Sequence, residues 1–337
     1  MKEASIVKLS IVILCWNDQK VIIDCLDSIF TRTHATEFEV IVSDNGSTDG
    51  SPELIRQKFP LVRVIENRAN LRFSKGNNVG IGASSGEYVL ILNPDTIVQE
   101  GSLDRLVAFA DAHPDAGGFG CRILNPDGSY QRSARPFPTI WRCWISALGL
   151  AGLGRFAKVF TADEYLGWNG DTVRPIDWQS GCCLLVRSGL LKQLGGFDDQ
   201  FQYYYEDVDL CRRIWGAGHP VLFTPSATVI HLGGQSTSTR FPVPFELDKH
   251  RNRYRYFYKY FGQKGARSCR RHSLTRIRVR QVKYGIRAMF RPTEGLRRRM
   301  ELYRAAAEWN RQIDPVELVQ HGREPETCKR IALQIPQ

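Results

Sequence analysis

Two aspartates directly follow apolar, strand-like segments, and their positions predict a ligand site. The apolar run 88–92 is typical of a strand buried on both faces, and Pro94 and Asp95 come soon after it. The segment 38–43 has the same character and leads into Asp44. Because open α/β sheets bind ligands at the carboxyl ends of their strands, we expect both carboxylates at one edge of one sheet. Such a pair of carboxylates predicts a site that binds a nucleotide and a metal ion.

Asp95 has the chemistry of a ligand for a hard divalent cation. Mg²⁺ and Mn²⁺ bind one or two carboxylates and complete their shells with phosphate oxygens. His231 follows a later strand-like segment, 221–230, and offers an imidazole for the same shell. An ordinary structural role is open to each residue, as a turn residue after proline and as a hydrogen-bonded histidine beside a strand.

Two further segments have residue types that suit a nucleotide diphosphate. Asp44 can accept hydrogen bonds from a base or ribose, although Asp-Asn-Gly-Ser is also the composition of a tight turn. The segment 70–80 combines glycine with Lys75, Asn77 and Asn78 just ahead of an expected helix, as in a phosphate cradle. It has neither the G-x-G-x-x-G nor the P-loop pattern, so neither of those sites is predicted.

Three acids, Glu206, Asp207 and Asp209, follow three tyrosines and begin a predicted helix. Acids in a first turn are favoured by the helix dipole, so a solvated cap is one explanation of the cluster. The other is a general base, because repulsion between carboxylates and partial burial raise the proton affinity of one of them. That change favours removal of a proton from a hydroxyl.

The elements that must position these residues alternate regularly. Strand-like runs at 9–14, 38–43, 62–66 and 88–92 are separated by segments with helical spacing of apolar residues. Right-handed crossovers then give a parallel, doubly wound sheet with its crevice at the carboxyl ends of the strands. The alternation fades over 125–176, where we expect loops and one amphipathic helix.

Composition predicts a full-size core and a basic appendage. The chain has 337 residues, 42% of them hydrophobic, which is enough for a large domain. The net charge of +11 is unevenly placed, because 249–304 holds 19 Lys and Arg against only Glu294 and Glu301. This asymmetry indicates a boundary near residue 245 and a basic surface suited to an anionic partner.

Composition also argues against several classes of protein. The amino terminus lacks the apolar region of a signal peptide, and no segment offers the roughly 20 apolar residues of a membrane span. We therefore expect a cytoplasmic protein. The nine cysteines show no zinc-ligand spacing, which favours reduced and mostly buried thiols.

Six motifs in order resemble the family 2 inverting glycosyltransferases of GT-A fold, and within them the bacterial branch that includes rhamnosyltransferases. The motifs are 9–17, 42–50, 70–80, 92–95, 195–198 with 205–210, and 231–236. The resemblance implies an α/β GT-A fold with a doubly wound, mostly parallel, Rossmann-like sheet. We expect a GT-A domain over 1–245, with a nucleotide-sugar-binding half at 1–120 and an acceptor and catalytic half at 121–245. A basic helical C-terminal region, 246–337, follows.

The resemblance implies roles for individual residues. Asp207 is the expected catalytic base, with Glu206 as its helper and the alternative base. Asp95 and His231 are the expected ligands of Mg²⁺ or Mn²⁺. The residues implied for nucleotide-sugar binding are Asn17, Asp44, Lys75, Asn78, Asn93 and Asp95. Asn93 replaces the first acid of the Asp-X-Asp usual in relatives, and Arg72 lies where glycine is usual.

The implied reaction moves a sugar, with rhamnose as one candidate, from a dTDP- or UDP-sugar to a glycan or polyprenyl-diphosphate-linked acceptor in polysaccharide or cell-wall assembly. Asp207 would take a proton from the acceptor hydroxyl as that oxygen attacks the anomeric carbon, so the configuration inverts. A different donor sugar with a non-lipid acceptor is the alternative.

The segment 245–260 mixes cations with aromatic residues, a pattern that suits a membrane interface or a nucleic acid. The resemblance favours an anionic membrane surface and peripheral association with the inner face of the cell membrane. Asp44, Asp95 and Asp207 argue against nucleic acid, because they would repel phosphates. A basic tail that only packs or forms a homo-oligomer is the remaining alternative.

Overall fold

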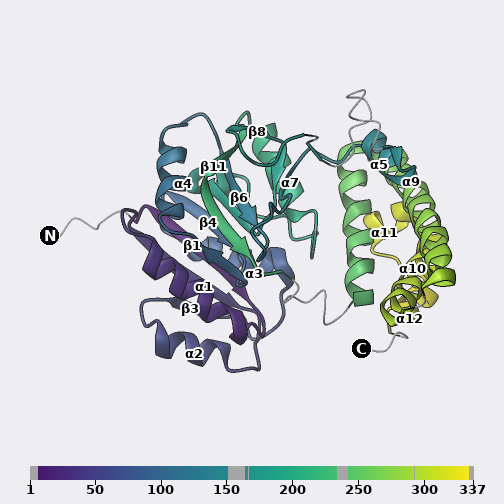
Figure 1. Cartoon of the computed structure of the whole chain (residues 1–337), viewed down its shortest axis with the longest axis horizontal. Helices are drawn as coiled ribbons and strands as arrows, with labels where there is room; N and C mark the ends of the chain where they lie inside the picture. Colours follow the sequence, from purple (N-terminus) through teal and green to yellow (C-terminus); the bar gives the residue numbers. More distant parts are fainter. Residues whose placement is uncertain (1–6, 151–163, 166, 234–241, 292, 334–337) are drawn as a thin grey trace. The chain divides into compact units, whose positions relative to one another are not determined.

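The computed structural model describes residues 7–150, 164–165, 167–233, 242–291 and 293–333. The last part of the predicted 231–236 motif therefore lies outside the described residues. Contacts divide the chain into two units (Figure 1). The first comprises 1–137, 167–202 and 206–236, and the second comprises 138–166, 203–205 and 237–337.

The first unit is built on a mixed sheet with the strand order β3-β2-β1-β4-β10-β6-β11-β5, and β8 pairs with β11. The strands are β1 Leu9–Cys15, β2 Phe38–Asp44, β3 Arg63–Glu66, β4 Tyr88–Leu92, β5 Thr96–Val98, β6 Gly118–Leu124, β8 Arg174–Ile176, β10 Cys183–Arg187 and β11 Val221–His231. Strands β3, β2, β1 and β4 are parallel, and β10 runs antiparallel beside β4. The predicted parallel sheet of the first hundred residues is confirmed. A separate ladder joins β7 Ala134–Arg135 to β9 Trp178–Gln179.

Helices cover both faces of this sheet because side chains alternate along each strand. The helices of the first unit are α1 Gln19–Arg32, α2 Ser51–Lys58, α3 Arg72–Ala83, α4 Ser102–Asp111, α6 Ser188–Gln193 and α7 Glu206–Gly216. Ile11 and Ile13 of β1 lie in one buried core with side chains of α1 and α4. Val12 of β1 lies on the other face, against Gly80 of α3. The sheet is therefore doubly wound, as predicted.

The segment 70–80 differs from the predicted loop ahead of a helix. Helix α3 begins at Arg72, so Lys75 and Asn78 lie inside the helix. The glycines of this segment serve close packing: a Cβ atom on Gly76 would lie 2.4 Å from Leu14 Cδ1. Glycine content alone predicted a loop, whereas the burial of the helix against β1 and β2 outweighs the weak helix propensity of glycine.

The second unit is helical, as predicted for the basic C-terminal region. Its helices are α5 Ile140–Ala147, α9 Pro242–Phe290, α10 Glu294–Gln312, α11 Pro315–His321 and α12 Glu326–Leu333. The helical backbone of α9 is broken at Gly262, where φ is 64°. Tyr254 is fully buried and stacks on Trp309 of α10 at a centroid distance of 6.1 Å. Tyr256 and Phe257 are also fully buried, so these three aromatic side chains form a core and not the predicted membrane contact.

Two predictions from composition can be compared with the structure. All nine cysteines are buried, as expected. Among the described helices, none is long and apolar enough to cross a membrane.

Two glycines of α3 test the close contact between this helix and β1. Gly80→Ala should lower the free energy of unfolding by about 1–3 kcal/mol, because the added methyl would lie 2.5 Å from Val12 Cγ1. Gly82→Ala is the matched control, since a Cβ there meets nothing within 4 Å. It should raise the stability by about 0.5–1 kcal/mol, the usual gain from replacing a helical glycine. Urea denaturation of both variants measures the difference, and equal stabilities would contradict the packing described.

Candidate active site

Asp44 organises a turn at the carboxyl ends of β1 and β2, where it pairs with Cys15 in the sheet register. Its buried carboxylate accepts hydrogen bonds from the Gly46 and Ser47 N–H groups at 3.0 and 2.9 Å and from Ser47 Oγ at 2.5 Å. Asn17 joins the same turn, because its Oδ1 accepts from the Thr48 N–H at 2.7 Å. Asp44 thus has the turn role that its neighbours in sequence suggested, and its contact with a nucleotide stays a prediction.

Asp95 and His231 meet at the same edge of the sheet. The register sets Leu92 of β4 beside Ile13 of β1, so residues 93–95 emerge next to the ends of β1 and β2. Asp95 is buried, and its Oδ1 lies 3.2 Å from His231 Nε2. Its Oδ2 is buried without a hydrogen-bond partner. Asn93 Nδ2 lies 3.5 Å from the same histidine nitrogen, so all three predicted residues come together.

The Asp95–His231 pair fits a divalent cation. The described part of the chain holds no cluster of three or more Cys, His, Asp and Glu that could bind a metal. Mg²⁺ and similar ions need few protein ligands when a substrate supplies phosphate oxygens, and the unpaired Asp95 Oδ2 is a ligand atom of the right type. Burial alone would lower the pKa of His231, but hydrogen bonds with Asp95 and Cys182 raise it to about 10. A cation would therefore have to displace a proton from this imidazole.

Glu206 and Asp207 begin helix α7 in different environments. Glu206 is buried, and its Oε2 has no hydrogen-bond partner. Burial, and then the charge of Asp207, raise the pKa of Glu206 well above its ordinary value. Asp207 stays partly exposed, and its carboxylate accepts from the Gly181 N–H at 3.1 Å and the Val208 N–H at 2.8 Å. The protonated form is thus favoured in Glu206.

The pKa of Asp207 is raised to about 6, because the effect of burial exceeds the opposing effects of its hydrogen bonds and of Arg135. A carboxylate with this pKa is ionised at neutral pH and binds a proton more strongly than an ordinary aspartate. These are the properties of a general base, and the partial exposure of Asp207 leaves it accessible to a substrate.

Asp209, the third acid of the cluster, has a structural contact. It is fully buried and pairs with Arg213 Nε at 2.8 Å one helical turn later. Arg213 also donates to the carbonyl groups of Leu194 and Gly196 at 2.8 Å. Asp209 and Arg213 thus stabilise the contact between α7 and the turn at 194–196. The three acids therefore have two roles, a structural one for Asp209 and a candidate catalytic one for Glu206 and Asp207.

The chain enters α7 through a strained backbone. Tyr204 and Tyr205 have φ values of 64° and 70°, in the left-handed region that side chains other than glycine seldom adopt. Tyr205 packs on Tyr256 of α9 at a centroid distance of 5.3 Å, and Asn252 of α9 donates a hydrogen bond to the Tyr203 carbonyl. Such strain persists only where neighbouring groups hold it, and it is concentrated at functional sites.

A short turn connects the acid pair to the Asp95–His231 pair. The Gly181 N–H donates to Asp207, while the carbonyl of the next residue, Cys182, accepts from the Asn93 N–H at 3.0 Å. Cys182 Sγ also lies 3.7 Å from Thr96 Oγ1. Two consecutive residues therefore contact both groups, which places Asp207 and residues 93–96 around one turn.

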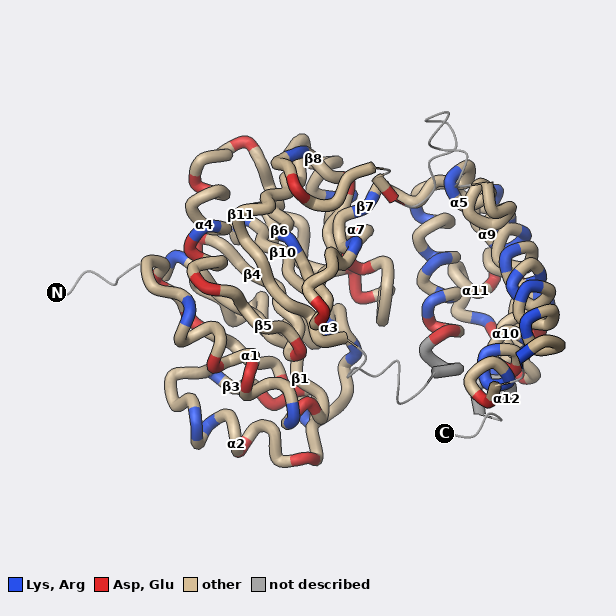
Figure 2. The backbone as a smooth tube through the Cα atoms, viewed as in Figure 1, with Lys and Arg blue, Asp and Glu red and all other residues tan. Residues whose placement is uncertain are grey.

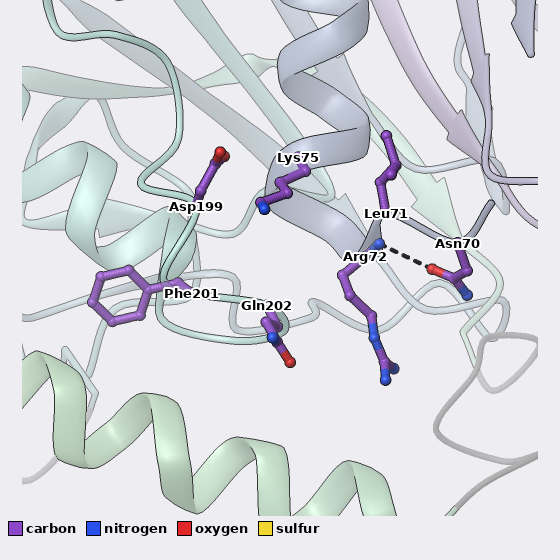
Figure 3. A pocket seen from close by; sticks show the side chains of 7 residues that line it. All are labelled: Asn70, Leu71, Arg72, Lys75, Asp199, Phe201 and Gln202. Atoms are coloured by element: carbon purple, nitrogen blue, oxygen red, sulfur yellow. Dashed lines mark hydrogen bonds between the residues drawn. The ribbon is translucent and has the colours of Figure 1, made fainter. Parts of the chain in front are cut away.

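Lys75 lines a cavity of about 270 Å³ at the start of α3 (Figure 3). The other lining residues are Asn70, Leu71, Arg72, Asp199, Phe201 and Gln202. Arg72, where relatives usually have glycine, has a φ of 67°, so the backbone keeps the conformation that glycine adopts easily. Arg72 and Lys75 bring two positive charges to the cavity, which suits an anionic group. Asp95 and Asp207 are not among its lining residues.

Asn78 makes structural contacts instead of lining this cavity. Its Nδ2 donates to the Phe197 carbonyl at 2.8 Å and to Asp199 Oδ1 at 2.9 Å, and its Oδ1 accepts from the Phe197 N–H at 2.9 Å. Both ends of the amide thus hold the segment 197–199 against α3. The predicted contact of Asn78 with a nucleotide sugar stays a prediction.

Three residues near the site were not found from the sequence. Gln131 Oε1 lies 2.9 Å from His231 Nδ1 and orients the ring. Arg135 lowers the pKa of Asp207, and the Gly181 N–H holds its carboxylate. Gln131 and Arg135 lie in the irregular segment 125–176, where no periodicity indicated their neighbours. Gly181 comes just before β10, and no pattern in the sequence predicted its contact with Asp207.

Comparison with known proteins shows the family of this chain. The family described as Glycosyl transferase family 2 matches residues 10–160. The N-acetylglucosaminyl-diphospho-decaprenol L-rhamnosyltransferase of Mycobacterium tuberculosis is 36% identical over 228 residues, which cover 64% of this chain and 73% of that protein. The chain belongs to glycosyl transferase family 2. The predicted family membership and glycosyltransferase activity are thereby confirmed.

Two further comparisons extend this result. The rhamnosyltransferase WbbL of Escherichia coli strain K12 is 25% identical over 224 residues, covering 62% of this chain and 78% of that protein. The crystal structure of GalNAc-T7 with UDP, GalNAc and Mn²⁺ superposes with a TM-score of 0.51 at 16% identity, covering 75% of this chain and 51% of that one. This likeness supports the GT-A fold alone.

The Asp95–His231 pair predicts a pH-dependent cation site. Asp95→Asn and His231→Gln should each weaken Mn²⁺ binding by about tenfold or more, measured by isothermal titration calorimetry. Wild-type affinity should rise from pH 6 to pH 8, because the cation must displace the His231 proton, and His231→Gln should lose this rise. Asp127→Asn, which changes an exposed turn acid, is the control. Equal Mn²⁺ affinity in the control and in the two site variants would rule out a cation here.

Proposed function

We propose that this glycosyltransferase transfers a sugar, with rhamnose as the first candidate, from a dTDP- or UDP-sugar to a sugar on a polyprenyl diphosphate. The transfer inverts the configuration at the anomeric carbon. The observation that carries the inverting reaction is Asp207, a partly exposed carboxylate held by two backbone N–H groups. The names of the rhamnosyltransferases from M. tuberculosis and E. coli support the choice of sugar. The name of the M. tuberculosis enzyme, 36% identical to this chain, supports the lipid-linked acceptor.

Asp207 acts as the general base. It accepts the proton of the acceptor hydroxyl while that oxygen bonds to the anomeric carbon and the bond to the nucleotide diphosphate breaks. The Gly181 and Val208 N–H groups orient its carboxylate. Glu206 is less suited to accept a proton, because burial and the charge of Asp207 raise its pKa well above its ordinary value and so favour its protonated form. In its protonated form, Glu206 adds no second negative charge beside Asp207 at the start of α7.

The donor binds along the edge formed by the ends of β1, β2 and β4. Asp95 and His231 hold a divalent cation, Mg²⁺ or Mn²⁺, which when bound neutralises charge on the donor diphosphate. Arg72 and Lys75 add positive charge at the start of α3. The turn that joins Asn17 and Asp44 is the proposed contact for the base and ribose, and Asn93 is a further proposed contact of the donor.

We further propose that residues 1–245 hold the transfer chemistry and that 246–337 serve attachment to the membrane. All the residues assigned above to catalysis and donor binding belong to the first unit. A polyprenyl chain stays in the bilayer, so an enzyme that acts on its sugar gains from peripheral association with an anionic membrane.

A panel of nucleotide sugars tests the donor. The purified chain should turn over dTDP-rhamnose with a lipid-linked N-acetylglucosamine acceptor and Mn²⁺, with inversion seen in the NMR coupling of the anomeric proton. UDP- and GDP-sugars are the comparison. Turnover of another donor with a non-lipid glycan would support the alternative transferase, and no turnover of any donor would contradict sugar transfer by this chain.

Variants of the acid pair test the assignment of the base. Asp207→Asn should lower kcat by about 100-fold or more, while donor binding persists. Glu206→Gln should keep most activity, because the amide resembles the protonated carboxyl group that it replaces. In the wild type, kcat/KM should fall as the pH drops below about 6, since the Asp207 carboxylate then takes up a proton. Full activity of Asp207→Asn combined with loss in Glu206→Gln would reverse the two roles.

A further inference from the structure

The last part of α9 exposes a series of large apolar side chains. They are Val279, Val282, Ile286, Met289 and Phe290, with exposed fractions of 47%, 62%, 51%, 72% and 79%. At 100° per residue these positions share one side of the helix, and we call them the apolar stripe. Single exposed apolar residues are common on protein surfaces, but a continuous patch of this kind marks a binding surface.

The opposite side of this part of α9 packs inside the second unit. Ile277 is buried with Ala306 and Ala307 of α10. Tyr284 stacks on Tyr303 of α10 at a centroid distance of 5.7 Å, and Arg280 donates to the Tyr303 hydroxyl at 3.0 Å. Helical spacing therefore directs the apolar stripe away from α10. The stripe is not needed for the contact between the two helices.

Cations border the apolar stripe on both sides. Arg278 lies at one border, and Lys283 and Arg287 lie at the other, at 100° per residue. All three are exposed. The sequence from 249 to 290 contains no aspartate or glutamate. Figure 2 shows basic residues distributed along α9 and α10. The surface thus combines an apolar centre with a margin of one sign of charge.

We propose that the apolar stripe, with Arg278, Lys283 and Arg287, binds the surface of an anionic lipid bilayer. A helix with an apolar face and basic margins lies in the plane of the interface, with its apolar side chains among the acyl chains and its cations at the headgroups. A nucleic acid would match the cations but would leave five apolar side chains without a suitable partner. A second copy of the same surface would bring like charges together.

This surface differs from the one expected from the sequence. Tyr254, Tyr256 and Phe257, expected to face lipid, are buried, whereas the apolar stripe lies further along the same helix. The inference does not rest on the proposed sugar transfer, because binding to vesicles is measured without donor or acceptor. Either can fail without the other.

Sedimentation of the full chain with vesicles tests the apolar part. The wild-type protein should bind anionic vesicles made from a mixture of phosphatidylcholine and phosphatidylglycerol. It should bind vesicles of phosphatidylcholine alone only weakly. The double variant Val282→Ser and Met289→Ser should partition about tenfold less to the anionic vesicles, since it loses two of the three most exposed side chains of the apolar stripe. The double variant Leu61→Ser and Val173→Ser changes residues with exposed fractions of 84% and 54% in the first unit and should bind like wild type.

A charge-matched pair of variants tests the basic margin. Replacing Arg278, Lys283 and Arg287 with Gln should reduce binding to anionic vesicles by about tenfold or more. Added salt should also weaken the binding of the wild-type protein, because it screens the charges. Replacing the exposed Lys20, Lys58 and Lys192 with Gln removes the same charge from the first unit. This control should bind nearly as well as wild type.

Three outcomes would overturn the proposal. Wild type that fails to bind anionic vesicles, or stripe variants that bind as well as their controls, would exclude a lipid surface here. A dimeric wild type that becomes monomeric in the Val282→Ser, Met289→Ser variant, with unchanged vesicle binding, would assign the stripe to self-association. Thermal melting followed by circular dichroism should give equal Tm values for wild type and all variants, because every substituted side chain is exposed.

Discussion

Burial of the apolar side chains of β1 and β4 is the constraint on which the active site depends. Apart from Leu14, the apolar residues of these two strands are almost completely inaccessible to solvent on both faces of the sheet. An ionised carboxylate within such strands would lose its hydration without a compensating partner, so the acids can occur only where the strands end. The parallel register of β1, β2 and β4 then brings those ends together. Asp44 and Asp95 share an edge as a consequence of how the core excludes charge.

Two buried carboxyl oxygen atoms of the candidate site, Glu206 Oε2 and Asp95 Oδ2, lack hydrogen-bond partners. The physical reason differs between the two. A buried polar group without a partner costs about 1–3 kcal/mol, so each needs a physical reason. Protonation explains Glu206 Oε2, because a neutral carboxyl group tolerates burial far better than a charged one. Asp95 Oδ1 faces His231, and the proposed cation, binding with the substrate, would give the unpartnered Oδ2 a partner.

The two units use basic residues in different ways. In the first unit, Arg135 and Arg213 act on neighbouring carboxylates, one by lowering the pKa of Asp207 and the other by an ion pair with Asp209. In the second unit, three aromatic residues expected at a surface, Tyr254, Tyr256 and Phe257, are buried, and many cations remain exposed on α9. Charge therefore shapes a reaction centre in one unit and an outer surface in the other.

The strands, most of the helices and the acids that follow them were determined by the sequence alone. The spacing of apolar residues and the order of the motifs can be read directly along the chain. They were enough to predict Asp44, Asp95 and Asp207 as candidate site residues and to indicate the family. Only the tertiary structure decided that Asp209 pairs with Arg213 and that Asn78 fastens residues 197–199. It also brought Gln131 to His231, a hundred positions apart. Such roles depend on which distant backbone and side-chain groups meet when the core closes, and no local pattern encodes that encounter.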